Sequence, residues 1–169
     1  MSDSNPSSIR TYFQYYMDKF PSDSPTEVLE NSLDELIDKL KNLGNHECEK
    51  AYAEGKWTIK QVLGHIIETE RVMSYRALRF SRNDQLEPVQ FDHDQYVVEA
   101  NYNDLALVDI MFELMTVRHA TLSLFKNMNN EMLNRRGGWS DGEFSVEEIA
   151  RIIAGHGQHH LDVILTKYL

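Results

Sequence analysis

The chain of 169 residues is long enough for one ordinary domain with a hydrophobic core. Hydrophobic residues make up 41% and charged residues 26%, proportions typical of globular proteins that argue against long disordered regions. The formal net charge of −10 disfavours nucleic acids and anionic membranes as binding partners, because both would be repelled.

The cysteine content and the N-terminus predict a cytoplasmic protein. Cys48 is the one cysteine of the sequence, so an internal disulfide is excluded. Its neighbours Glu47 and Glu49 would raise the pKa of the thiol, which disfavours a catalytic role. Residues 1–6 lack the basic region and apolar run of a signal peptide, and no apolar run approaches membrane-spanning length.

Residues 1–24 are polar at first and then rich in aromatic side chains. We interpret them as a polar tail followed by an aromatic arm that packs on the body of the protein. The aromatic residues of this arm are Tyr12, Phe13, Tyr15, Tyr16 and Phe20. The domain itself would then span residues 25–169.

The first long helix is expected to begin with Ser24 as cap and Pro25 at the first helical position, and to stop at Gly44. Leucines at four-three spacing predict one apolar face along it. They are Leu29, Leu33, Leu36, Leu40 and Leu43.

The second helix is expected from Thr58 to about Arg82, because Thr58 and Gln61 form a capping-box pattern. Apolar residues from Ile59 to Phe80 continue along one face of this helix. We interpret its arginines as a solvated flank, with the binding of an anionic substrate as the alternative. These arginines are Arg71, Arg76, Arg79 and Arg82.

A long connection, residues 83–102, follows the second helix and contains the acidic run Phe91-Asp92-His93-Asp94. Connections of this length are uncommon in compact domains and are often functional. We expect a short helix near residues 95–100 within it. Asp92 or His93 could reach a functional site from this segment.

The third helix is expected from Asn103, a good cap, to Met128, and the fourth from Ser145 to the C-terminus. Ser145 and Glu148 repeat the capping-box pattern, and the segment between these helices, residues 129–144, carries turn signals. Four long amphipathic helices without a convincing strand pattern predict an all-α protein, an antiparallel four-helix bundle.

Two histidines interrupt the apolar seam of the fourth helix. His156 and His160 are four residues apart, so both side chains lie on one face, where hydrophobic residues would be expected. Buried imidazoles need polar partners, and a single metal ion would satisfy both. His159 leaves a second pair open, because it is three residues from His156. Gly155 and Gly157 indicate either room for a site or close helix packing.

His65 on the second helix is the candidate for a third metal ligand, since an antiparallel or diagonal arrangement would bring it to the pair in the bundle interior. Three histidines leave coordination positions open, as catalytic sites require. Glu68 could orient a ligand or act as a general base. The alternative is an ordinary charged residue paired with Arg71 or Arg118.

Several segments, in the order in which they occur along the chain, resemble the DinB/YfiT-like family of metalloenzymes. Residues 57–71 (WTIKQVLGHIIETER) resemble the family's helix-two signature, and residues 154–161 (AGHGQHHL) resemble its C-terminal metal motif. Residues 75–79 and 91–97 continue the resemblance between them. The similarity covers nearly the whole chain beyond the polar N-terminus.

The resemblance implies a four-helix bundle with a divalent metal ion, nickel or zinc, on His65, His156 and His160, and leaves His159 outside this set. It also implies a homodimer. It further implies either hydrolysis or a transfer reaction with a low-molecular-weight thiol as co-substrate.

The function expected from these observations is metal-activated hydrolysis, or thiol-dependent transfer, on a small molecule at a three-histidine site. Glu68, Asp92 and His93 are the candidates for proton transfer. One alternative is a non-catalytic, metal-containing binding or stress-response module. The other is a set of histidines that merely fills the helix seam.

Overall fold

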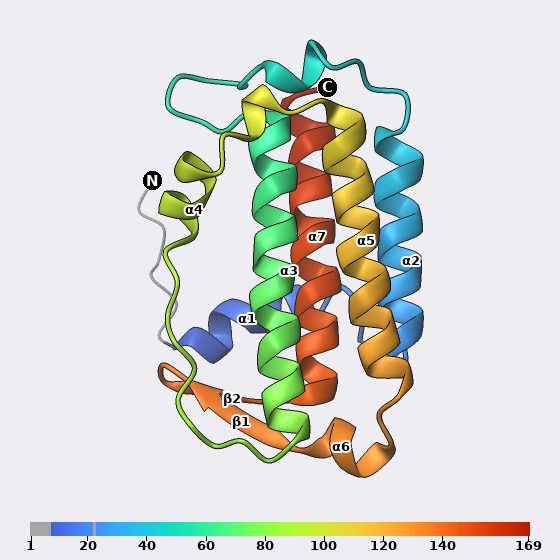
Figure 1. Ribbon diagram of the computed structural model, residues 1–169, viewed down its shortest axis with the longest axis vertical. Helices are drawn as coiled ribbons and strands as arrows, with labels where there is room; N and C mark the ends of the chain where they lie inside the picture. Colours follow the sequence, from blue (N-terminus) through green and yellow to red (C-terminus); the bar gives the residue numbers. More distant parts are fainter. Residues whose placement is uncertain (1–7, 22) are drawn as a thin grey trace.

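Four long helices lie side by side in the computed structural model, which describes residues 8–21 and 23–169 (Figure 1). They are α2 (Pro25–Leu40), α3 (Ile59–Ser81), α5 (Leu107–Lys126) and α7 (Val146–Lys167). The predicted four-helix bundle is confirmed. The polar tail expected at the N-terminus, residues 1–7, lies outside the described residues.

The helices do not simply alternate in direction. In Figure 1, α3 and α5 run the same way, because the long connection between them returns the chain to the end where α3 began. Helices α3 and α7 run in opposite directions and pack against each other. This pairing places the first half of α3 beside the second half of α7.

Three helix starts follow from their caps, as predicted. Ser24, Thr58 and Ser145 each accept a hydrogen bond from the backbone N–H three residues later, and the side chain there returns the bond. The expected start at Asn103 was wrong, because α5 begins at Leu107. Asn103 lies instead in the 3₁₀ helix η2 (Tyr102–Asp104), where its side chain accepts a hydrogen bond from Thr58 Oγ1 at 2.6 Å.

A two-stranded antiparallel hairpin closes one end of the bundle, which corrects the expectation of no strands. It consists of β1 (Arg136–Trp139) and β2 (Gly142–Ser145). The rings of Trp139 and Phe144 stack on it at 4.3 Å between centroids. Four-residue strands that contain three glycines between them are too short to show an alternating pattern, so only the pairing of the strands reveals them.

The aromatic arm contains a helix of its own, α1 (Ile9–Met17), which packs against α7 near the hairpin (Figure 1). Phe13 and Tyr16 are buried there. The remaining short elements are η1 (Glu47–Glu49), α4 (His93–Glu99) and α6 (Asn130–Asn134). Helix α4 begins two residues before the expected position because the Asp92 side chain caps it.

A layer of polar side chains divides the apolar core into two clusters. One cluster gathers around α1, the hairpin and the first half of α7, and the other gathers around the first half of α3 and the second half of α7. His65, Thr69, Glu70, Arg118 and His156 are buried but belong to neither cluster. Buried polar groups need partners, so this layer is where a functional site is expected.

Within the described residues, no helix combines the length and the apolar character needed to cross a membrane.

Candidate metal centre

Three imidazole rings meet in this polar layer. Helix α3 contributes His65, and the antiparallel helix α7 contributes His156 and His160 one turn apart. His156 Nε2 lies 3.0 Å from His65 Nε2 and 3.1 Å from His160 Nε2. Nitrogens that ligate one tetrahedral zinc ion at about 2.0–2.1 Å are roughly 3.3 Å apart, so these atoms fit a shared ion.

The two short contacts at His156 Nε2 cannot both be hydrogen bonds. A ring nitrogen in the plane of an imidazole carries either one proton or one lone pair. It can therefore act once, as a donor or as an acceptor. One cation at the common point would accept the lone pairs of all three rings, which no arrangement of protons achieves.

Burial keeps these rings neutral. It lowers the pKa of His65 to about 4 and that of His160 to about 3, with the neighbouring histidines adding to the effect. The pKa of His156 is also lowered, chiefly by burial and then by His160 and His65. A neutral imidazole presents a lone pair, so all three rings are in the state that binds a metal.

The other histidines lie outside this set of three nitrogens. His159 points to the aromatic arm, where its Nδ1 lies 3.3 Å from the hydroxyl of Tyr15. His46 and His119 are exposed. The open alternative of a His156–His159 pair is therefore not the one that the fold assembles.

The three candidates for proton transfer have different surroundings. His93, at the start of α4, has its ring centroid 5.4 Å from that of His65, and its side chain is 54% exposed. Asp92 is exposed, and its side chain caps α4. Glu68 accepts a hydrogen bond from the Tyr102 hydroxyl at 3.2 Å, and burial raises the pKa of its carboxyl. Of the three, His93 is the one beside the histidine cluster.

The partners expected for Glu68 were wrong. Arg71 forms its ion pair with Glu113 at 2.6 Å, and Arg118 forms a fully buried ion pair with Glu70 at 2.8 Å. Glu70, two residues after Glu68, is the acidic residue of α3 that pairs with Arg118 of α5. The rotation of α3 relative to α5 therefore decides which carboxylate forms the ion pair.

Close helix packing explains Gly155. A Cβ atom at this position would overlap the backbone carbonyl of Tyr16, so glycine lets α1 lie directly on α7. A Cβ at Gly157 would meet Leu36 Cδ1 at 3.4 Å, Arg118 Nη2 at 3.9 Å and Ile66 Cγ2 at 4.0 Å, which are ordinary contacts. Close packing therefore requires glycine at position 155 but not at position 157, on the other side of His156.

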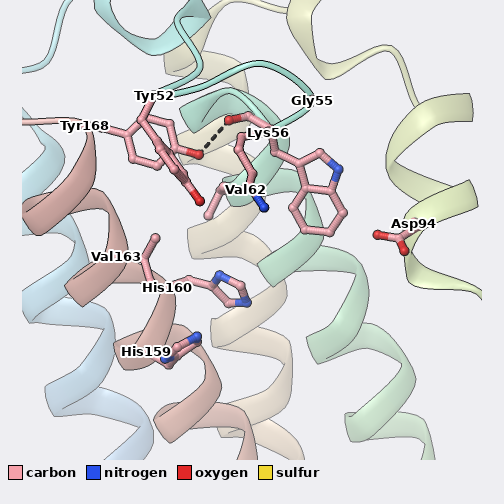
Figure 2. A pocket seen from close by; sticks show the side chains of 10 residues that line it. Tyr52, Gly55, Lys56, Val62, Asp94, His159, His160, Val163 and Tyr168 are labelled. Carbon is pink, nitrogen blue, oxygen red and sulfur yellow. Dashed lines mark hydrogen bonds between the residues drawn. The ribbon is translucent and has the colours of Figure 1, made fainter. Parts of the chain in front are cut away.

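Two cavities reach the histidines from different sides. The first, of about 320 Å³, is lined by His160, His159 and Trp57 together with Tyr52 and Tyr168. Figure 2 looks into it, with both histidines on α7 below Tyr168 and Lys56. The Tyr168 hydroxyl donates a hydrogen bond to the Trp57 carbonyl across its rim at 2.6 Å.

The second cavity, of about 220 Å³, contains His65, His156 and His93 in its wall. We call it the aromatic cavity, because Tyr12, Phe13, Phe91 and Trp139 also line it. Its remaining lining residues are Ile9, Thr69, Met73, Arg76 and Gln90. A small molecule in it would lie directly against two of the three candidate ligands.

Two residues that line the aromatic cavity, Arg76 and Trp139, were not predicted to lie there. Arg76 was interpreted as part of a solvated flank, but it is 3% exposed. The signal was present in the pattern, since Arg76 lies between Met73 and Ala77 on the apolar face of α3. Trp139 carried only a turn signal, and the long-range packing of the hairpin brings it to the cavity.

The family model of the DinB superfamily matches residues 28–164, most of the chain and all three histidines. This chain belongs to the DinB superfamily. The resemblance noted in the sequence is thereby confirmed. The match begins within α2 and ends within α7, so the DinB superfamily region contains the whole four-helix bundle apart from its outermost ends.

Relatives of this DinB superfamily protein carry names that refer to a metal. It is 27% identical over 135 residues to "Putative metal-dependent hydrolase OB0413" of Oceanobacillus iheyensis, covering 79% of this chain and 77% of that protein. It is 23% identical over 155 residues to "Putative metal-dependent hydrolase BH0277" of Halalkalibacterium halodurans, covering 81% and 86%.

A solved structure shares the fold of this DinB superfamily protein. YfiT from Bacillus subtilis, described as "a probable metal-dependent hydrolase with an unusual four-helix bundle topology", superimposes with a TM-score of 0.75. The superposition covers 98% of this chain and 90% of YfiT at 14% sequence identity. At that identity the likeness establishes the fold.

Proposed function

We propose that this protein is a metal-dependent enzyme that acts on a small molecule, with hydrolysis as its reaction. His65, His156 and His160 would hold one divalent ion, for which nickel and zinc both suit imidazole donors. The observation that carries the proposal is the convergence of three neutral Nε2 atoms at 3.0 and 3.1 Å on a point beside two cavities. The names of the relatives support the same chemistry.

An ion held there would act as a Lewis acid toward water or a substrate carbonyl. The surrounding residues suit this task. Phe91, Trp139 and Phe13 give one cavity an apolar wall that limits water around the substrate. His93 lies beside His65 with half of its side chain exposed, so it can accept a proton near the site and pass it to solvent.

Elemental analysis of untagged protein tests the metal. Wild-type protein and His119→Ala should each contain about one ion per chain, whereas His156→Ala and His160→Ala should lose most of it. His119 is the matched control because it is an exposed histidine on a neighbouring helix. Wild-type protein without metal, or equal metal content in His156→Ala, would contradict the proposal.

Turnover tests the reaction. Hydrolysis of small aryl esters by the metal-loaded protein should proceed without a thiol and fall on His93→Gln with the metal content unchanged. An electrophile consumed only in the presence of a thiol would instead establish thiol-dependent transfer. Metal without turnover in either assay would favour the non-catalytic binding module.

A further inference from the structure

A buried arginine without a counter-ion lies in the wall of the aromatic cavity. Arg76 is 3% exposed, and its guanidinium carbon is 4.6 Å from the ring centroid of Trp139. Two other arginines of the same helix are matched by carboxylates: Arg71 pairs with Glu113, and Arg79 pairs with Asp84. Among the described residues, no carboxylate forms an ion pair with Arg76.

The donors of this guanidinium are largely unused. Its Nη1 donates to the Met73 sulfur at 3.8 Å, a weak acceptor, and its buried Nε has no partner in the described part of the chain. The cation–π contact with the Trp139 ring offsets only part of the free-energy cost of burying an unpaired charge. Burial alone lowers the pKa of Arg76, to about 10.

A second unsatisfied donor lies on the same face of α3. The Thr69 hydroxyl is buried and has no hydrogen-bond partner among the described residues. His65, Thr69, Met73 and Arg76 follow each other at spacings of four, four and three, so all four line the aromatic cavity from one helix. At a rise of about 1.5 Å per residue, the Cα atoms of His65 and Arg76 are roughly 16 Å apart along the axis.

We propose that the aromatic cavity binds a small organic acid, whose carboxylate is held by Arg76 and Thr69 and whose body packs on Trp139, Phe13 and Phe91. Its other end would face the histidines, a part of the inference that rests on the proposed function. The planar guanidinium donates to a carboxylate through two parallel bonds, and the hydroxyl supplies a third. A net charge of −10 repels anions, so the local cation must supply the attraction.

Calorimetric titration of the full-length protein tests this directly. Benzoate is the probe, neutral benzyl alcohol controls for the aromatic contact, and inorganic phosphate tests whether the site prefers that other oxyanion. Each titration is made with protein as purified and after chelation of metal. The chelated arm removes any binding of the carboxylate to the ion.

Three variants separate the contributions. Arg76→Met should weaken benzoate binding at least tenfold in both preparations, Arg76→Lys should restore part of it, and Thr69→Val should weaken it severalfold. Arg79→Met is the matched control, because Arg79 lies one turn further and is paired with Asp84. Arg76→Met should keep its metal content and unfold at the same temperature as wild type or a higher one, since it removes a buried charge.

The outcomes distinguish this inference from the proposed function. If no metal is bound, the two preparations will behave alike and the effect of Arg76→Met on benzoate will still be measured. Equal benzoate affinity in wild type and Arg76→Met would overturn the inference. Benzyl alcohol binding as tightly as benzoate, or no saturable benzoate binding by wild type, would also overturn it. Clearly tighter binding of phosphate than of benzoate would overturn the assignment of a carboxylate as the ligand.

Discussion

Among single residues, His156 is central to the candidate site. Its Nε2 faces two other ring nitrogens, and burial keeps all three rings from taking up protons. The same neutral state that serves a metal makes the site sensitive to acid, because an unfolded histidine accepts a proton near pH 6.5. The cluster therefore links stability to pH.

Acid should destabilise the metal-free protein between about pH 6.5 and pH 4. In that range the unfolded state binds protons that the folded state refuses, because burial lowers the pKa of His65 to about 4 and that of His160 to about 3. The unfolding free energy then decreases as the pH is lowered, by roughly 3 kcal/mol for each histidine that resists protonation in the folded state. Urea unfolding of chelated protein at pH 7, 5.5 and 4.5 measures it.

The variant His160→Leu serves as the comparison. It removes one of the rings that resist protonation, so the loss of stability on acidification should be smaller than in wild type. At pH 7 without metal its stability should equal or exceed that of wild type. Parallel curves for the two proteins would refute this explanation of the acid sensitivity.

At the scale of elements, the site depends on how closely α1, α3, α5 and α7 approach one another. Gly155 lets the backbone of α1 lie on α7, and the buried pair Glu70–Arg118 ties α3 to α5. Arg118 Nη1 also donates to the Leu29 carbonyl at 2.8 Å and to Ser32 Oγ at 2.7 Å, which adds α2. These contacts fix the rotation of the helices that present the histidines.

Alanine at the two glycines of α7 should have opposite effects. Gly155→Ala should destabilise the protein by about 1–3 kcal/mol, since the new Cβ displaces the backbone of α1. Gly157→Ala should be neutral or stabilise by up to about 1 kcal/mol, because alanine favours the helix and meets only ordinary contacts. Urea unfolding of both variants at pH 7 checks this, and equal effects would contradict the packing argument.

The ion pair of α3 and α5 should behave as a unit. Glu70→Leu leaves the Arg118 charge buried without its carboxylate and should cost about 3–5 kcal/mol of unfolding free energy. The double variant Glu70→Leu/Arg118→Met should lose much less, because neither charge remains. A double-mutant cycle in urea measures the coupling, and additive single effects would show that the pair does not act together.

At the scale of the whole molecule, α5 is apolar beyond the face it turns to the core. Val108 and Phe112, four residues apart on this helix, are 71% and 68% exposed. A separate apolar cavity between α2 and α5, lined by Leu107, Val108 and Met111 among others, adjoins this surface. Exposed apolar groups of this kind are typical of association surfaces.

We expect the homodimer implied by the family resemblance to use this surface of α5. Sedimentation velocity should then find a dimer for the wild-type protein and a monomer for Val108→Lys/Phe112→Lys, with unchanged helix content. Glu99→Lys, at an exposed position on α4, is a control that should remain dimeric. A monomeric wild type, or a dimeric double variant, would rule out this surface.

Most of the helix starts and the three candidate metal ligands could be predicted from local sequence patterns. The helix starts at Ser24, Thr58 and Ser145 depend on contacts within three or four residues, so a short stretch of sequence is enough to predict them. His156 and His160 stand out in an apolar seam for the same reason, since helical periodicity is local.

Which groups meet across elements depends on the packing of segments that are distant in the sequence. The hairpin depends on the pairing of two segments, the exclusion of His159 depends on where α1 lies, and the partners of Glu68 and Glu70 depend on helix rotation. The burial of Arg76 arises in the same way, because the hairpin carries Trp139 onto it. Contacts between distant segments depend on the register and rotation of whole helices, which no local pattern specifies.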